Sequence, residues 1–186
     1  GLKKYGGDLA IGAFGIVNRL VFIVVMIVMG LNQGMQPIAG YNFGAKLYGR
    51  VNKVLRLTII YATAVTTFGF LVGMLVPDLV VGIFTSDAEL TELSVTGLRI
   101  TVMFFPIIGF QMVTSNFFQS IGMAGKAIFL SLTRQMLILL PCLLVLPQFF
   151  GVAGLWYSMP VSDLLASLIA LVMLVCQFRK FRTSPL

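Results

Sequence analysis

Residues 152–178 read VAGLWYSMPVSDLLASLIALVMLVCQF. This segment is apolar and long enough to cross the ~30 Å hydrocarbon layer of a membrane as one helix, which takes about 20 residues. It contains a single charged side chain, that of Asp163. Further apolar segments of similar length precede it, so the sequence predicts five membrane spans, at about 10–40, 57–77, 95–121, 128–148 and 152–178.

The composition also favours a membrane protein. Apolar residues make up 59% of the 186 positions and charged residues only 10%, whereas soluble domains carry about 25% charged residues. The chain has no His and 6 carboxylates, so hydrolytic, redox and zinc chemistry lack their usual residues, and we expect no enzyme, no metal site and no cofactor. Cys142 and Cys176 lie inside apolar runs, where a thiol behaves as a small apolar side chain.

The loops on the two sides of the predicted membrane carry opposite charges. Basic residues without acidic neighbours follow spans one, three and five, namely Lys46, Arg50, Lys53, Arg56, Lys126, Arg134, Arg179, Lys180 and Arg182. The loop between spans two and three carries Asp78, Asp87, Glu89 and Glu92. The positive-inside rule predicts a cytoplasmic C-terminus and an external N-terminus, although Lys3 and Lys4 would then lie outside. This charge pattern explains the net charge of +7 better than nucleic-acid binding does, so we expect no nucleic acid partner.

Prolines and glycines predict that the spans pack together. The prolines that interrupt or bound the predicted helices are Pro37, Pro106, Pro141, Pro147 and Pro160, and each removes a backbone donor that a bundle must compensate. Glycines spaced four residues apart can bring helix backbones close together, and three such pairs occur: Gly30 with Gly34, Gly40 with Gly44, and Gly69 with Gly73. The fold class expected is all-α, a polytopic transmembrane helical bundle.

Several motifs resemble one transporter family. Residues 30–46 read GLNQGMQPIAGYNFGAK, and FQSIGMAGK follows at 118–126, TRQ at 133–135, LPQFFGVAGLW at 146–156 and MPVSD at 159–163. Over about residues 8–180 the chain resembles the multidrug and toxic compound extrusion family of proton- or sodium-coupled drug exporters. It looks most similar to a bacterial drug-exporter branch that has Pro-x-x-Asp in its last helix.

The resemblance implies an architecture. Members have two six-helix lobes related by an axis along the membrane normal, and both termini are cytoplasmic. The chain (1–186) is then similar to the second, C-terminal lobe without its first helix, which independently implies an external N-terminus. The resemblance also implies a bacterial inner (plasma) membrane location, the missing N-terminal lobe and the lipid bilayer as partners, and protons or sodium ions as coupling ions without a cofactor.

Asp163 is the first candidate functional residue, because it is the one carboxylate well inside a span. It lies about 16 Å along the helix from Val152, close to the middle of the bilayer. An ionisable group at that depth needs a partner or a wet cavity. Trp156 and Met159 lie on or near its helix face, and an aromatic ring, a thioether and a carboxylate facing one space suit a lipophilic cation. The alternative is a structural ion pair of Asp163 with a neighbouring helix, for example through Arg134.

Span three carries a polar stripe that must face protein or water. Its members are Gln111, Ser115, Asn116 and Gln119. They either line a substrate cavity or form hydrogen bonds between helices. Some family members carry a cation-coordinating acid on the corresponding helix, but no carboxylate lies in this span. A sodium site of that type is therefore not expected in this lobe.

A second polar group surrounds Pro37 at the inner end of span one. Gln33, Gln36, Pro37 and Asn42 either close the cavity on the inner side or serve helix packing, because irregular backbone is tolerated where protein surrounds it. Arg19 is expected to extend outward to the interface.

The resemblance implies secondary active efflux of amphipathic or cationic compounds in antiport with protons or sodium ions, with the fragment alone inactive. One alternative is a lipid-linked sugar flippase of the wider superfamily. Such a flippase would need several Arg and Lys side chains in its cavity to bind pyrophosphate, and in this chain only Arg19 is a candidate. A non-transporting membrane scaffold is another alternative, against which Asp163 argues. A channel is a further alternative, and ion flux in the absence of a coupling gradient would distinguish a channel from an exporter.

Overall fold

The structure is a computed structural model that describes residues 2–183, with side chains described for residues 7–180 and 182. The side chains of Lys3 and Lys4 therefore lie outside the described ones. All regular elements in the described part are helical, which confirms the predicted all-α class. In chain order they are α1 (Leu2–Gly44), α2 (Tyr48–Leu75), α3 (Pro77–Val81), α4 (Ala88–Val102), α5 (Phe105–Ser120), α6 (Ala124–Leu132), the π-helical segment η1 (Thr133–Leu139), α7 (Leu140–Phe150) and α8 (Val152–Thr183).

Four helical stretches are long and apolar enough to cross a membrane alone, and they lie over four of the five predicted segments. They are Gly7–Gly44, Tyr48–Leu75, Ala124–Phe150 and Val152–Lys180. α1 is broken at Gly7, whose φ of 68° lies in the left-handed region, so its membrane-length part begins there. The bent pair α4 and α5 is long and apolar enough to make a fifth crossing if the two helices act together as one broken span.

The third predicted span, at 95–121, differs from a single helix. It starts earlier, at Ala88, and it consists of two helices bent by 54° at the break between Val102 and Phe105. Pro106 occupies the first turn of α5, and because proline has no N–H it cannot donate to the carbonyl of Val102. The chain therefore ends one helix and starts another at this point.

The fourth crossing contains a change of helix type that the sequence analysis did not predict. The stretch Thr133–Leu139 is π-helical and continues directly into α7. Pro141 lies in the first turn of α7, and its missing N–H removes the α-helical hydrogen bond to the carbonyl of Leu137. The wider π turn precedes this proline and places Arg134 inside the irregular segment.

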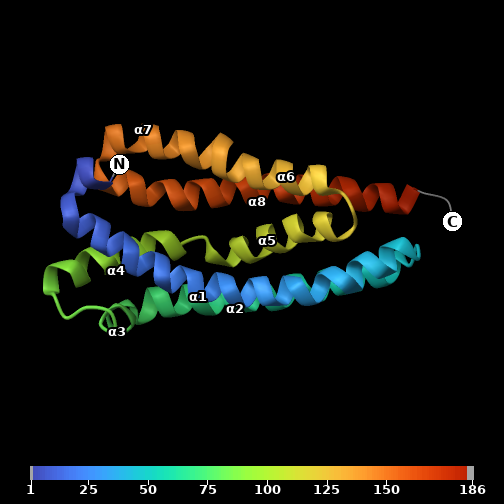
Figure 1. The fold of residues 1–186 in the computed structure, drawn as a ribbon, viewed down its shortest axis with the longest axis horizontal. Helices are drawn as coiled ribbons and strands as arrows, with labels where there is room; N and C mark the ends of the chain where they lie inside the picture. The colour runs from blue at the N-terminus through green and yellow to red at the C-terminus, as the bar shows by residue number, and fades with distance from the viewer. Residues whose placement is uncertain (1, 184–186) are drawn as a thin grey trace.

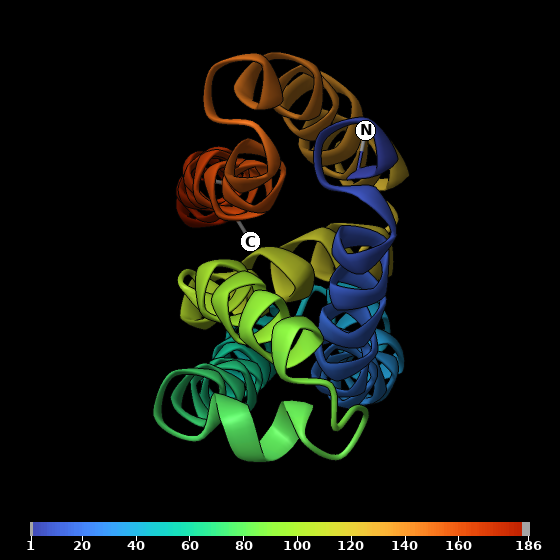
Figure 2. The same cartoon turned by 90° about the vertical axis from the view of Figure 1, so that its left-hand side faces the viewer.

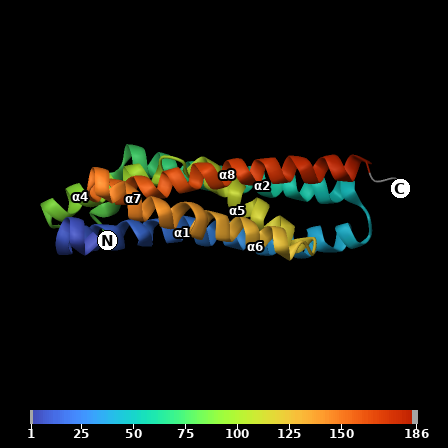
Figure 3. The ribbon, with the colours of Figure 1, turned by 90° about the horizontal axis from the view of Figure 1, so that it is seen from above.

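The helices form an elongated bundle with two parts (Figures 1 and 2). α1 packs against α2, α4 and α5, and α2 also packs against α5. On the other side, η1 and α7 pack along α8, which reaches the first part through α5 and α4. The view from above shows the same extended bundle (Figure 3). α5 and α4 thus join the two parts, together with α8.

The bundle has two apolar core clusters and an apolar outer surface. One cluster lies around Leu55, Phe117 and Phe118, and the other around Phe105 and Trp156. Large apolar side chains also point outward, including Phe68 at 69%, Leu144 at 62% and Phe149 at 76% exposed. In a soluble protein such a surface would aggregate, whereas in a membrane it faces lipid tails.

The predicted glycine pairs differ in their surroundings. A Cβ added at Gly69 would lie 3.0 Å from a Val24 methyl carbon, and one at Gly73 would lie 2.9 Å from a Val102 methyl carbon. For this pair, α2 therefore does approach its neighbours closely. Gly40 also makes a close approach, here to the carbonyl oxygen of Ser120, but Gly30, Gly34 and Gly44 have nothing within 4 Å. The close approach of another helix that was expected at the pair of Gly30 and Gly34 is therefore absent from the described structure.

Candidate functional site

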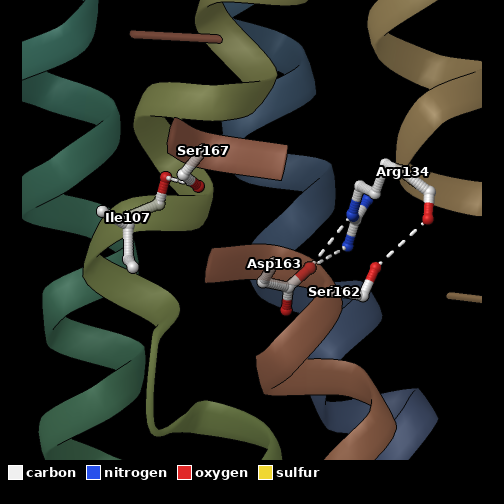
Figure 4. Close-up of polar contacts among 5 residues, drawn as sticks. All are labelled: Ile107, Arg134, Ser162, Asp163 and Ser167. Atoms are coloured by element: carbon white, nitrogen blue, oxygen red, sulfur yellow. Dashed lines mark hydrogen bonds and ion pairs between the residues drawn. The ribbon is translucent and has the colours of Figure 1, made fainter. Parts of the chain in front are cut away.

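Asp163 forms an ion pair with Arg134 inside the bundle (Figure 4). The Arg134 Nη2 donates to Asp163 Oδ1 at 2.7 Å, and Nε donates to the same oxygen at 3.0 Å. The Asp163 side chain is 5% exposed and that of Arg134 is 31% exposed. The structural partner considered for Asp163 from the sequence is thus present.

Two further hydrogen bonds fix the helices around this pair (Figure 4). Ser162 Oγ donates to the backbone carbonyl of Arg134 at 3.2 Å, which fastens η1 to α8 beside the carboxylate. One helical turn further, Ser167 Oγ donates to the carbonyl of Ile107 at 3.3 Å and connects α8 to α5. The carboxylate therefore has a fixed position between three helical segments.

A second polar contact joins span one to the polar stripe of span three. Gln36 Nε2 donates to Asn116 Oδ1 at 3.0 Å. The amide of Asn116 in turn donates to the carbonyl of Met112 at 3.0 Å. The predicted closure set and the predicted cavity stripe thus meet at these two residues, as a hydrogen bond between α1 and α5.

The stripe continues toward α6. Ser115 Oγ lies 3.4 Å from Ser131 Oγ, and both hydroxyls line a pocket of about 310 Å³ between α5 and α6 together with Gln119. Gln111, the fourth predicted member of the stripe, is only 5% exposed. The stripe therefore combines a buried end at Gln111 with an open end at Gln119.

The remaining closure residues are not gathered in one place. Asn42 is buried, and its amide donates to the carbonyl of Ile38 at 2.8 Å within the same helix. Gln33 and Pro37 are exposed on the outside of α1. Of the four predicted residues, only Gln36 makes a hydrogen bond to another helix.

Trp156 packs among apolar side chains. Its indole is 4% exposed and lies 5.8 Å from the ring of Phe14, centroid to centroid. A Cβ at Gly97 would meet its Cη2 at 2.5 Å, so the ring fills the space between α1, α4 and α8. Met159 is half-buried. The aromatic side of the predicted cation site is thus part of the apolar packing.

Several polar residues were missed by the sequence analysis, among them Ser131, Ser162 and Asn32. Ser131 and Ser162 are single hydroxyls in apolar runs, and such hydroxyls usually bond to their own helix. Asn32 lies in the quoted motif, is 2% exposed and has neither its Oδ1 nor its Nδ2 in a hydrogen bond. The sequence signal that could have identified Asn32 is an amide side chain inside an apolar span, which needs a partner there.

The described residues contain no group of three or more His, Cys, Asp or Glu side chains that could hold a metal ion. The chemistry available inside the bundle is therefore that of one carboxylate, one guanidinium and several amides and hydroxyls.

Comparison with known proteins places these features in a family. Residues 2–144 match the MatE family. The multidrug export protein MepA of Staphylococcus aureus (strain MSSA476) is 27% identical over 166 residues, which cover 89% of this chain and 36% of MepA. MepA of Staphylococcus saprophyticus is 24% identical over the same share of both chains.

Solved structures agree with this match. The chain superposes on the MATE multidrug transporter DinF-BH in complex with R6G with a TM-score of 0.85 and 36% identity, covering 98% of this chain and 41% of that one. An outward-facing MATE transporter of the MOP superfamily, 18% identical, gives a TM-score of 0.90 over 98% of this chain and 41% of its own, which supports the fold. The chain spans about two fifths of the length of these relatives. By the match over residues 2–144, the chain belongs to the MatE, or multidrug and toxic compound extrusion, family of membrane transporters.

Proposed function

We propose that this chain takes part in the efflux of amphipathic or cationic compounds, in exchange for protons or sodium ions. The observation that carries the proposal is the ion pair of Arg134 with the buried Asp163 inside a membrane bundle of this family. A charged pair in a span is costly and usually marks an ion or substrate pathway. The names of the relatives, multidrug export protein and multidrug transporter, support the substrate class.

The chain would act as the second lobe of a two-lobe transporter, without the first helix of that lobe. This proposal is supported by the four membrane-length stretches, by the bent pair α4 and α5 as a candidate fifth crossing, and by the share of about two fifths of the relatives' length. Alternating access in such transporters moves one lobe against the other around a central site. A partner lobe is therefore required for transport.

Arg134 and Asp163 would couple the ion to the movement. The charged carboxylate of Asp163 attracts the guanidinium of Arg134. Protonation of the carboxylate removes this attraction, and a sodium ion bound at the carboxylate competes with it. Because Arg134 lies in η1 and Ser162 holds the same segment, a change at the carboxylate acts directly on the irregular part of the fourth crossing. Gln111, Ser115, Asn116 and Gln119 would offer adaptable polar contacts to substrates, with Met159 on α8.

The proposed orientation puts the basic end of the bundle in the cytoplasm and the acidic loop outside, in a bacterial inner membrane. Support comes from the separation of Lys46 and Arg50 at one end from Glu89 and Glu92 at the other. With an odd number of crossings, the first described helix then starts outside.

The test uses the complete two-lobe transporter in vesicles with a fluorescent cationic dye. We expect Asp163→Asn to abolish dye movement driven by a pH or sodium gradient at equal expression. Glu92→Gln is the matched control, because it also removes one carboxylate charge but at an exposed position. Separate pH and sodium gradients identify the coupling ion. Wild-type efflux with unchanged ion dependence in Asp163→Asn would reduce Asp163 to a packing residue and refute the proposal.

A further inference from the structure

A cavity lies between the start of α2 and the end of α8, away from the Arg134 and Asp163 pair. Its volume is about 540 Å³, within the range of about 300–1,000 Å³ that is common for ligand sites. Its lining residues are Tyr48, Gly49, Asn52, Leu55, Arg56, Ile59, Ile60, Phe178 and Arg182. Both helix segments lie at the end of the bundle where α1 passes into α2 (Figure 1).

The outer part of the cavity is positively charged. Arg56 on α2 and Arg182 on α8 are exposed side chains that line it together. The carboxylates of the sequence are Asp8, Asp78, Asp87, Glu89, Glu92 and Asp163, and none belongs to the α1–α2 turn or to the end of α8. The described part of this end therefore offers the two guanidinium groups no side-chain carboxylate, and an anion from outside the chain could bind both.

The inner part of the cavity is apolar. Ile59 and Ile60 lie deeper along α2 than Arg56, and Phe178 lies deeper along α8 than Arg182. Phe178 stacks on the buried ring of Phe117 at 6.5 Å between centroids, so this wall is anchored to the core.

The apolar wall also continues along the helices toward the middle of the bundle. Leu171 and Val175 are 48% and 44% exposed, and their spacing puts them on the same face of α8 as Phe178 and Arg182. Ile60 is 55% exposed on the α2 side. The cavity is thus open to the lipid side and amphipathic along its length.

We propose that this cavity binds an anionic phospholipid, with its phosphate between Arg56 and Arg182 and an acyl chain along Ile60, Phe178 and Val175. Basic pockets between membrane helices bind lipid head groups in this manner. A soluble anion would use the two arginines but would leave the apolar walls empty. A zwitterionic lipid would use the walls but would gain less from the arginines, since its head group carries a compensating positive charge.

The test measures lipid binding to the 186-residue chain in neutral detergent by native mass spectrometry, with dioleoyl phosphatidylglycerol against dioleoyl phosphatidylcholine. We expect tighter binding of phosphatidylglycerol. Each arginine should contribute about fivefold, so that Arg56→Gln with Arg182→Gln weakens its binding about 30-fold. The matched control is Arg50→Gln with Lys53→Gln, which removes the same charge at the same end of the bundle outside the cavity lining. This control should change binding less than threefold.

Three results would overturn the proposal. Equal binding of the two lipids would show that the arginines do not select an anion. Equal weakening by the control pair would show that only net charge matters. Glycerol phosphate without acyl chains binding as tightly as phosphatidylglycerol would indicate a site for soluble anions instead.

Discussion

Removal of either partner of the Arg134 and Asp163 pair should destabilise the bundle, but by unequal amounts. Arg134→Met removes both donors to Asp163 Oδ1 and leaves a carboxylate that is 5% exposed. Asp163→Asn instead leaves a guanidinium whose side chain is 31% exposed and which can extend toward a more polar region. The arginine variant should therefore be the less stable one.

The magnitude follows from the burial of the group that is left behind. Breaking a buried pair by removing one partner costs about 3–5 kcal/mol, because an uncompensated charge remains. We expect about 3 kcal/mol for Arg134→Met, where the remaining charge is buried, and about 1 kcal/mol for Asp163→Asn, where it is partly exposed. A difference of about 2 kcal/mol corresponds to about 30-fold in the unfolding equilibrium.

The measurement is reversible unfolding of the chain in mixed micelles with increasing sodium dodecyl sulfate. The double variant completes a double-mutant cycle and isolates the pairwise free energy. Lowering the pH should stabilise the Arg134→Met variant, because protonation removes its unpaired charge, whereas the Asp163→Asn variant has no carboxyl group at this position and should not gain stability in this way. Asp163→Asn costing as much as Arg134→Met, or a coupling free energy below about 0.5 kcal/mol, would refute the reasoning.

Three further predictions concern packing, orientation and transport. Gly109→Ala should lower the free energy of unfolding by about 1–3 kcal/mol, since its Cβ would lie 2.9 Å from the carbonyl oxygen of Ala62. Gly34→Ala, whose Cβ would have nothing within 4 Å, should be neutral or stabilising by up to about 1 kcal/mol. Equal effects of the two substitutions in denaturation would contradict this. In a cysteine-free background, Glu89→Cys should react with an impermeant thiol reagent from outside and Arg50→Cys only from the cytoplasm, and the reverse pattern would overturn the orientation. The 186-residue chain alone in vesicles should not move a cationic dye along a pH or sodium gradient, and saturable, gradient-driven movement would disprove the need for a second lobe.

The places of the four membrane-length helical stretches could be predicted because they depend on local composition. An apolar run of about 20 residues has few alternatives to a helix in lipid. Pro106 also identified the region of the break in span three. The angle of 54° could not be predicted, because Phe105 contributes to a core cluster with residues of several other helices, and those contacts depend on the whole bundle.

Contacts between helices were harder to predict because they depend on helix rotation. Gly30 with Gly34 and Gly69 with Gly73 have the same spacing, yet only the second pair makes a close approach. Gln36 and Asn116 are separated by 80 positions, and their hydrogen bond requires α1 and α5 to lie side by side in the correct register. Polarity alone indicated that each side chain needs a partner, without identifying it.

Trp156 illustrates a limit of helical periodicity. It lies seven residues before Asp163, two turns along the same face, so the sequence suggested one shared site. Long side chains of a helix point toward its N-terminus, which carries the indole further from Asp163 and against Gly97 of α4. Spacing along a helix therefore predicts the face of a residue better than the neighbour it contacts.

The polar contacts converge on α5 and α8, and this has a consequence for movement. Gln36 bonds to α5, Ser167 of α8 bonds to α5, and Asp163 of α8 binds Arg134. Water does not compete for these bonds in lipid, so separating the helices would leave polar groups unpaired. The contacts to α5 are between neutral groups and do not respond to an ion. The contact to Arg134 joins two charges and lies in the π-helical segment before Pro141. We therefore expect a change in the charge of Asp163 to act on the fourth crossing first, while the hydrogen bonds from α1 to α5 and from α8 to α5 are kept.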